Sequence, residues 1–275
     1  MGRRDVNWTP DFMGFGNHLY LWAWAHAGRG VGPERRVLIT PKMRYWAEVF
    51  PDARPLLIDH EEVRLLDKRG YYWADPLRHT GDRRGFTMSG REAFIRECLL
   101  PAPLFDVGSG SGPASQDVLT LSVRRGDFYS DPGHRPVHAI DLDAYLRRAV
   151  DGSFVTQGTP ERVHVVSDDP HWCREHLAWL GDQARAVTYA STADSPADNF
   201  RDIATSRRLV ISNSTFSMWG AFVSRTIHRD NAAEIWSPAF FMSTYGPGRC
   251  YEYDSDWSFI DSLPDGWQPD RILNP

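Results

Sequence analysis

The chain has 275 residues, which is enough for one large domain or two domains of ordinary size. Hydrophobic residues make up 41% and charged residues 24% of it, proportions typical of a folded globular protein and not of a disordered, fibrous or membrane-embedded chain. The formal net charge of −5 at pH 7 gives no general attraction to nucleic acid or anionic lipid, so any polyanion must be bound locally.

The basic residues are almost all arginines, because only Lys42 and Lys68 among the 31 lysines and arginines are lysines. No Gly-Lys-Ser or Gly-Lys-Thr tripeptide occurs, which excludes a P-loop nucleotide site. Arginine can bind phosphate through two parallel N–H groups, so arginine is the basic side chain best suited here to contact a phosphate.

Three cysteines, Cys98, Cys173 and Cys250, are too few and too scattered for a disulfide framework and indicate a reducing compartment. The N-terminus has no apolar signal segment, and no run of about 18 apolar residues occurs that would span a membrane. We therefore expect a cytoplasmic protein without integral membrane association.

The first part of the chain reads as an α/β region. Short apolar runs bounded by Pro, Asp and Gly predict buried strands at 35–40 and 54–59. A pattern that is apolar on nearly all sides predicts a buried helix at 17–28, and an amphipathic pattern predicts a helix at 90–100. Residues 69–90 show no clear periodicity and are expected to form a loop with short strands.

Gly, Ser and Pro concentrate in 106–116, which marks a linker between an N-terminal domain at 1–112 and a C-terminal domain at 113–275. Strands and helices alternate after this linker. The predicted strands are 117–123, 162–167, 184–190, 208–213 and 233–238. The predicted helices are 141–150, 170–180, 195–206 and 216–227. This alternation predicts a parallel, doubly wound sheet, whose ligands bind beyond the carboxyl ends of the strands.

The first strand of this sheet leads into Arg124, Arg125 and Asp127, and Ser122 lies near its end. Two adjacent arginines at a strand end either form ion pairs with acids such as Asp127 or hold an anionic ligand. The position at the carboxyl edge of an α/β sheet favours phosphate binding.

The second strand ends in Asp168 and Asp169, directly before Pro170. One of these two aspartates is expected to cap the following helix. The other is then free to accept hydrogen bonds from paired N–H groups, such as a guanine edge, or from sugar hydroxyls.

The fourth strand is followed by four small polar residues before a helix: Asn213, Ser214, Thr215 and Ser217. The free N–H groups of that helix form an anion site, although an ordinary N-cap is equally compatible with this segment alone.

Two weaker patterns complete the set. Gly14 and Gly16 precede the buried helix at 17–28, as in an ordinary turn or where a backbone approaches a ligand. His171 and Cys173 are two residues apart on a predicted helix and therefore diverge, so no metal site is expected there.

These segments resemble, in order, the motifs of the glycosyltransferase family 11 α-1,2-fucosyltransferases. "GFGNHLYLWAWAHA" is similar to the family's Gly-Leu-Gly-Asn-Gln segment, "LSVRRGDFY" to its His-x-Arg-Arg-Gly-Asp-Tyr motif, and "VVSDDPHWC" to its Ser-Asp-Asp-x-x-Trp-Cys segment. The most specific likeness is that of 198–224 to the family's Ile-x-Asn-Ser-Thr-Phe-Ser-Trp-Trp-Gly-Ala block. The chain departs from these motifs at Ser122 (His in the family), Met218 (Trp) and His18 (Gln).

The resemblance implies a GT-B-type α/β fold, with two Rossmann-like domains facing each other across a cleft. The N-terminal domain would be the acceptor side, and the C-terminal domain would hold the donor, GDP-fucose. The implied reaction is the inverting transfer of L-fucose to a glycan hydroxyl, in α-1,2 linkage to galactose, without a metal or another cofactor. A different nucleotide-sugar donor and a non-catalytic carbohydrate- or nucleotide-binding relative are the alternatives.

Carried over residue by residue, the resemblance implies that Arg124 holds the β-phosphate and that Arg125 supports it. Asp168 or Asp169 would receive the guanine. The expected donor-binding residues are Ser122, Arg124, Arg125, Asp168, Asp169, Asn213, Ser214, Thr215, Ser217, Gly14, Gly16 and Asn17. Asp127 is either the general base for the acceptor hydroxyl or an ion-pair partner that orients the arginines, and the second role is favoured.

Overall fold

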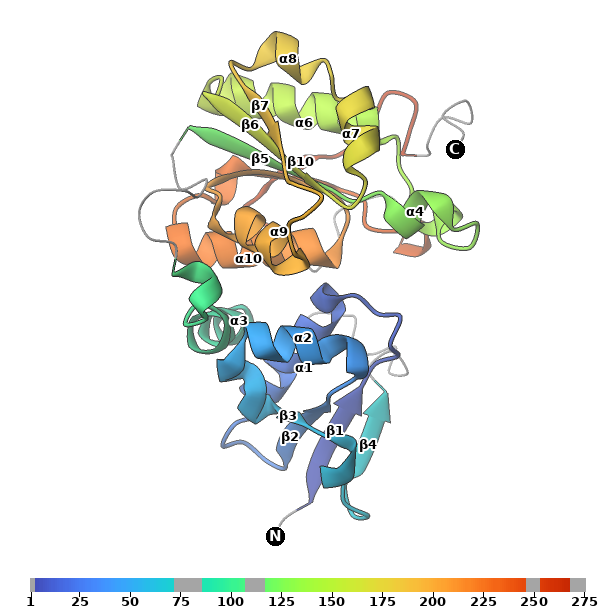
Figure 1. The fold of residues 1–275 in the computed structure, drawn as a ribbon, viewed down its shortest axis with the longest axis vertical. Helices are drawn as coiled ribbons and strands as arrows, with labels where there is room; N and C mark the ends of the chain where they lie inside the picture. Colours follow the sequence, from blue (N-terminus) through green and yellow to red (C-terminus); the bar gives the residue numbers. More distant parts are fainter. Residues whose placement is uncertain (1–2, 72–85, 107–116, 246–252, 268–275) are drawn as a thin grey trace. The chain divides into compact units, whose positions relative to one another are not determined.

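The computed structural model describes residues 3–71, 86–106, 117–245 and 253–267. The chain divides into two compact units, Met1–Gly108 and Ser109–Pro275 (Figure 1). The predicted domain boundary, between residues 112 and 113, lies outside the described residues, as does most of the predicted linker.

Unit 1 contains a four-stranded sheet in the order β3-β2-β1-β4. Its strands are β1 (Arg4–Trp8), β2 (Glu34–Leu38), β3 (Leu57–Ile58) and β4 (Lys68–Tyr71), and every neighbouring pair is parallel. The strand predicted at 35–40 is confirmed. The strand predicted at 54–59 is mostly wrong, because Pro51–Leu56 forms a 3-10 helix and only two residues pair with β2.

The α-helices in the described part of unit 1 are α1 (Phe15–Ala27), α2 (Pro41–Val49) and α3 (Met88–Phe94), which continues as one π-helical segment at Ile95–Leu99. Every residue of α1 except Asn17 and Ala27 is buried, which confirms the helix that its all-round apolar pattern predicts. The ring of Phe15 stacks on Trp46 of α2 with centroids 3.7 Å apart, so aromatic packing fixes the start of α1.

His18 is a buried polar side chain in the first turn of α1, and its Nε2 lies 2.8 Å from the Thr9 hydroxyl. Burial, reinforced by the positive charge of Lys42, lowers the pKa of His18 to about 4. The imidazole is therefore neutral in the folded protein at neutral pH.

Unit 2 contains a six-stranded sheet in the order β10-β9-β8-β5-β6-β7, again with every neighbouring pair parallel. The strands are β5 (Val118–Val123), β6 (Arg162–Ser167), β7 (Val187–Tyr189), β8 (Arg208–Ile211), β9 (Ile235–Pro238) and β10 (Ser258–Ile260). The first five confirm the predicted strands, and β10 is an additional edge strand. The chain passes from β5 to β6 and β7 and then returns to β8 on the other side of β5, so the strand order reverses at β5 and β8.

Helices cover both faces of this second sheet, with α9 and α10 on one face and α6, α7 and α8 on the other (Figure 1). The helices of the unit are α4 (Gly126–Ser130), α5 (Arg135–His138), α6 (Leu142–Gln157), α7 (Pro170–His176), α8 (Leu180–Gln183), α9 (Pro196–Thr205) and α10 (Thr215–His228). The single helix predicted at 170–180 is wrong, because the chain leaves the helix at Leu177 and starts again at Leu180. None of the helices in the described ranges is long and apolar enough to cross a bilayer.

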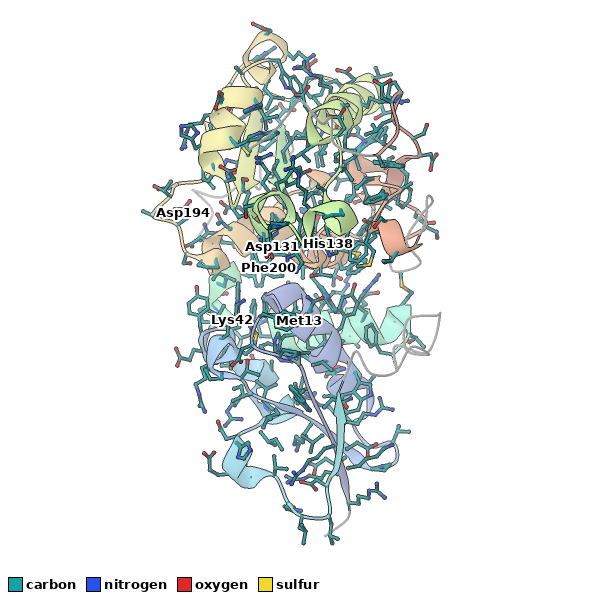
Figure 2. All side chains as sticks on the ribbon, turned by 90° about the vertical axis from the view of Figure 1, so that its right-hand side faces the viewer. Met13, Lys42, Asp131, His138, Asp194 and Phe200 are labelled. Carbon is teal, nitrogen blue, oxygen red and sulfur yellow. The ribbon has the colours of Figure 1, made fainter. Side chains whose placement is uncertain are left out.

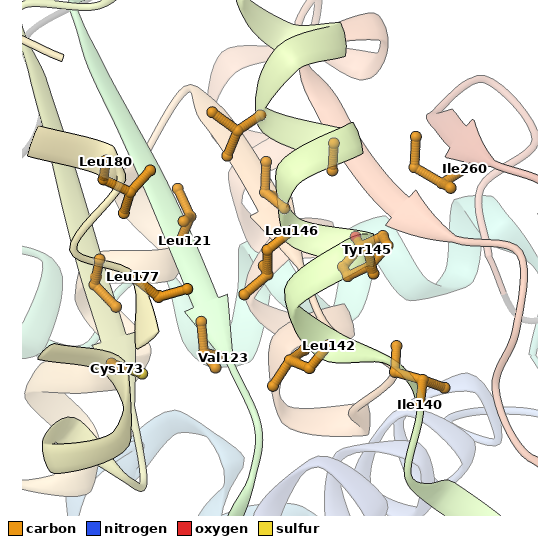
Figure 3. Packing of buried hydrophobic residues seen from close by; sticks show 14 of the residues in the cluster. Leu121, Val123, Ile140, Leu142, Tyr145, Leu146, Cys173, Leu177, Leu180 and Ile260 are labelled. Carbon is orange, nitrogen blue, oxygen red and sulfur yellow. The ribbon is translucent and has the colours of Figure 1, made fainter. Parts of the chain in front are cut away.

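Helix α6 packs against the central strand β5 through buried hydrophobic side chains. Figure 3 shows Leu142, Tyr145 and Leu146 of α6 beside Leu121 and Val123 of β5, in one buried hydrophobic cluster. The hydroxyl of Tyr145 donates a 2.6 Å hydrogen bond to the backbone oxygen at position 211, the last residue of β8. The ends of β5 and β8 are thereby fixed from beneath by the same helix.

The neutral state of His18 predicts a pH-dependent stability. The unfolded chain binds a proton on this side chain below about pH 6.5, whereas the folded chain resists it down to about pH 4. The free energy of unfolding should fall as the pH drops through that window, by up to about 3 kcal/mol from this group.

Urea unfolding at pH 7 and pH 5 tests this expectation. His18→Gln can keep a hydrogen bond to Thr9 but does not titrate, so its stability should fall less than that of the wild type. The solvent-exposed His171, changed to Gln, is the control and should leave the wild-type pH dependence unchanged. Equal pH dependence in the wild type and His18→Gln would show that His18 is not the responsible group.

Candidate functional site

The candidate site lies where β5, β6 and β8 end side by side in unit 2. The register pairs Ser122 with Ile211 on one side and Val123 with Ser167 on the other, so the residues that follow the three strands meet at one edge. The backbone N–H of Arg124 donates to the Ser212 hydroxyl at 3.1 Å, which joins the ends of β5 and β8. This edge is the switch point of the sheet, where ligands of parallel α/β sheets bind.

Arg124 lies between two carboxylates at this edge. Its Nη1 donates to Asp168 Oδ2 at 2.7 Å, and its Nη2 pairs with Asp127 Oδ1. The ring of Phe128 lies under the guanidinium, 5.2 Å from its centre. One third of the Arg124 side chain is exposed, so the guanidinium is oriented by its partners and still open to solvent.

Asp168 holds two consecutive residues at once. Its Oδ2 accepts from the Arg124 side chain, and its Oδ1 accepts from the backbone N–H of Arg125 at 2.8 Å. Gly126 makes this possible, because a Cβ at that position would lie 2.4 Å from Asp168 Oδ2. The glycine of the Arg-Arg-Gly-Asp segment therefore leaves room for the carboxylate that orients the first arginine.

Arg125 has a different environment from its neighbour. Its guanidinium lies between the rings of Tyr129 and Trp172, at 4.6 and 4.5 Å, and its Nε donates to Asp169 Oδ2 at 3.0 Å. Asp169 also caps α7, because its Oδ1 accepts from the Trp172 N–H at 3.1 Å. This confirms that one of the two aspartates caps the helix. The expectation that the other is free is wrong, because Asp168 accepts from the Arg124 side chain and from the Arg125 N–H.

The predicted donor-binding serines lie beneath the edge. Ser122 and Ser217 are both buried, and their hydroxyl oxygens are 2.7 Å apart. Ser212 is also buried, with its hydroxyl 3.4 Å from that of Ser217. These three hydroxyls connect β5, β8 and α10 under the site rather than facing solvent.

Of the other polar residues between β8 and α10, two make structural hydrogen bonds and one is partly exposed. Asn213 is buried, and its side-chain amide donates to the backbone oxygens of His138 and Phe241 at 2.8 and 3.0 Å. Ser214 caps α10 by accepting from the Phe216 N–H at 3.3 Å. Thr215, half-buried, is the first residue of the helix, so it and the amides of that turn are the groups available to an anion.

Gly14, Gly16 and Asn17 belong to unit 1. Gly14 is the N-cap of α1 with φ of −76°, and a Cβ there would meet no atom within 4 Å, so its backbone does not require glycine. Gly16 is buried in the first turn, and the Asn17 N–H donates to the Gly14 oxygen at 3.0 Å. These residues form the turn into α1.

The segment after Arg125 adds residues that the sequence patterns did not single out. Asp127 Oδ2 lies 3.5 Å from Nδ1 of His134, and the ring of His138 stacks on Phe128 with centroids 4.4 Å apart. Figure 2 labels His138 on this stretch, together with Asp131, whose carboxylate accepts from the backbone N–H groups of the His134 turn. Burial and the charge of the neighbouring His134 lower the pKa of His138. Helices of four and five residues are too short to show a periodicity, which is why they were missed.

Metal ligands are not grouped in this part of the molecule. Across the described residues, no three His, Cys, Asp or Glu side chains lie close enough together to hold a metal ion. Cys173 is fully buried in the core, where burial raises its pKa to about 11, and His171 is exposed.

The buried Ser122–Ser217 pair generates a prediction about the construction of the edge. Changing either serine to Ala leaves the other hydroxyl buried without that partner, which should lower the free energy of unfolding by roughly 1–3 kcal/mol. Changing both removes the unpaired group as well, so the double variant should lose less than the sum of the two single losses. Urea denaturation of the three variants measures the coupling, and strictly additive losses would contradict the pairing.

Comparison with known proteins gives the family of this chain. The family model "Glycosyl transferase family 11" matches residues 100–259. Galactoside alpha-(1,2)-fucosyltransferase 1 of Saimiri sciureus is 26% identical over 244 residues, which are 79% of this chain and 65% of that protein. The protein of the same name from Oryctolagus cuniculus is 26% identical over 173 residues, 59% of this chain and 44% of that protein. The matches thus cover less than two thirds of each relative's length.

Among solved structures, the E. coli heptosyltransferase WaaC with ADP aligns with a TM-score of 0.50 and 12% identity, over 95% of this chain and 94% of that chain. This likeness concerns the fold alone, and it identifies the pair of parallel α/β units as the GT-B fold. The family match spans more than half of the chain and includes β5, β6, β8 and α10, whose ends form the candidate site. The chain therefore belongs to glycosyl transferase family 11 and has the GT-B fold.

Proposed function

We propose that this protein is an inverting fucosyltransferase that moves L-fucose from GDP-fucose to a glycan hydroxyl, in α-1,2 linkage to galactose. The observation that carries the proposal is the open guanidinium of Arg124, held by Asp127 and Asp168 at the switch point of the second sheet. The α-(1,2)-fucosyltransferase relatives support the choice of donor and linkage.

The donor site follows from the contacts of the two arginines. Arg125 is enclosed by Tyr129, Trp172 and Asp169, so it supports the edge without reaching the ligand. Arg124 binds the β-phosphate when Asp168 Oδ2 leaves it. The freed carboxylate oxygen then accepts from the guanine edge, while Oδ1 remains on the Arg125 N–H. Exchange of one anion for another keeps the charge on Arg124 balanced.

Catalysis depends on the charge that develops on the leaving group. As the bond between the anomeric carbon and the β-phosphate oxygen breaks, negative charge builds on the diphosphate. Arg124 and the free amides in the first turn of α10 stabilise that charge. Since these groups supply the positive charge, we expect transfer to proceed without a metal ion.

Asp127 acts in this scheme as the partner that orients Arg124. One of its carboxylate oxygens pairs with the guanidinium and the other faces His134. A carboxylate that is already engaged on both oxygens is poorly placed to take a proton from the acceptor.

A binding and transfer experiment tests the donor. GDP should raise the melting temperature equally with and without EDTA, and GDP-fucose with a galactose-terminated acceptor should give product, whereas GDP-mannose and UDP-galactose should not. Arg124→Lys keeps a charge but loses the planar fork, so it should lower kcat more than it lowers GDP affinity. Arg147→Lys alters a surface ion pair with Asp143 and is the matched control.

Three outcomes would contradict the proposal. A melting shift with another nucleotide but none with GDP would reject the donor. Binding of GDP-fucose without transfer to any galactoside would favour a non-catalytic relative. Unchanged turnover in Arg124→Lys would remove Arg124 from the mechanism.

Asp127→Asn separates the orienting role from that of a general base. As an orienting partner, Asp127 should be needed for binding, so the variant should show weaker GDP binding together with a lower melting temperature. As a general base it would leave both unchanged and lower turnover by a factor of about 100 or more. Calorimetry and turnover on one preparation decide, and intact binding with lost turnover would overturn the orienting role.

A further inference from the structure

A cavity of about 550 Å³ opens at the amino ends of the strands in unit 1. Its lining residues begin β1, β2 and β3, so it lies at the edge of the sheet opposite to the carboxyl ends, where ligands of parallel sheets bind. Four arginines and two glutamates supply all the charged side chains of the lining: Arg3, Arg4, Arg36, Arg64, Glu34 and Glu62. The cavity therefore carries a surplus of positive charge in a protein whose net charge is negative.

The four arginines differ in what already occupies them. Arg4 is buried, and its guanidinium is fixed by Asp67 at 2.7 and 3.2 Å. Arg36 pairs with Glu34. Within the described ranges, Arg3 and Arg64 are exposed and have no carboxylate within 4 Å of their side chains. Two cations at the rim are thus available to an external anion.

Exposed aliphatic side chains lie in the segments that adjoin the lining of this cavity. Leu65 and Leu66, which directly follow Arg64, are 93% and 80% exposed. Val31, 67% exposed, precedes Gly32 and Pro33 of the cavity lining. Single exposed aliphatic residues are ordinary, but three on two loops that border one arginine-lined cavity form a surface that gains from leaving water.

Lys68 and Arg69, the first residues of β4, extend the positive charge along the chain beyond Leu66, and both are exposed. Glu61 is the exposed acid nearest to them in sequence outside the lining. The segment from Arg64 to Arg69, which leads into the start of β4, thus presents two leucines between cationic residues. This combination suits the boundary between lipid headgroups and acyl chains, where apolar tips enter the membrane and cations meet phosphates.

We propose that this edge of unit 1 docks on the surface of a bilayer that contains anionic phospholipids. Leu65, Leu66 and Val31 enter the acyl region, and Arg3 and Arg64 bind lipid phosphates at the mouth of the cavity. A soluble anion would use the arginines but would not benefit from the leucines, so the two features together favour a membrane. The attachment is peripheral and is independent of the proposed transfer reaction.

Vesicle sedimentation tests the proposal, using phosphatidylcholine with about 30% phosphatidylglycerol beside pure phosphatidylcholine. The full chain should bind the mixed vesicles and dissociate from them at high salt. It should not bind vesicles of pure phosphatidylcholine. Replacing both Leu65 and Leu66 with Ser should weaken binding by about tenfold or more, because two apolar side chains lose their transfer into lipid. Val155→Ser, on an 86% exposed residue of unit 2, is the matched control and should bind as the wild type does.

Two charge-reversal variants test the contribution of the arginines. Replacing both Arg3 and Arg64 with Glu should abolish binding, whereas Arg185→Glu, at an exposed arginine of unit 2, should lower it little. Melting temperature and donor turnover on a soluble acceptor should stay at the wild-type level in all four variants, which separates this test from that of the proposed function.

Two results would overturn the membrane proposal. The first is failure of the wild type to bind anionic vesicles. The second is vesicle binding that is unchanged by the leucine replacements while heparin competes for Arg3 and Arg64, which would identify the cavity as a site for a soluble polyanion.

Discussion

The carboxylate of Asp168 is the contact on which the candidate site depends. It accepts from the side chain of Arg124 and from the backbone of Arg125, so it fixes how the chain leaves β5 and where the first guanidinium lies. Its position requires the absence of a side chain at Gly126. The strand register brings the carboxylate to this point, because β6 ends next to β5. A fold-level property, the pairing of two parallel strands, thereby sets the geometry of a single arginine.

The sequence predicts the second sheet well because its strands carry their own signal. β5 and β8 are buried at every position and are dominated by branched apolar residues, and β6 carries three valines, so each is a run rich in the residues that favour strands. β1 and β10 lack such runs, and their pairing is supplied by neighbours: β1 lies between β2 and β4, and β10 extends β9. Tertiary context of this kind leaves no trace in a short window of sequence.

The sequence predicts where the candidate site lies, but not which of its side chains are buried and which are exposed. The motifs place Arg124, Asp127 and Asp168 at one strand edge, and the structure brings these three together. The same motifs give Ser122 and Ser217 the appearance of ligand-binding hydroxyls, whereas both are buried against each other. The sequence pattern of a small polar residue at a strand end is the same whether its hydroxyl binds a ligand or is buried in the structure. Only the packing of the folded chain decides whether that hydroxyl faces solvent. The participation of the predicted residues in donor binding stays a prediction.

The enclosure of Arg125 has a consequence for how the edge behaves over time. With the rings of Tyr129 and Trp172 against it and Asp169 on its Nε, that guanidinium is held as part of the scaffold. Arg124 is instead shared between the carboxylates of Asp127 and Asp168 and is one-third exposed. An anion that binds Arg124, as we propose for the donor diphosphate, would therefore compete with these two carboxylates. Such competition would lower the affinity for any anion, including the product diphosphate, and would shorten the time for which the product occupies the site.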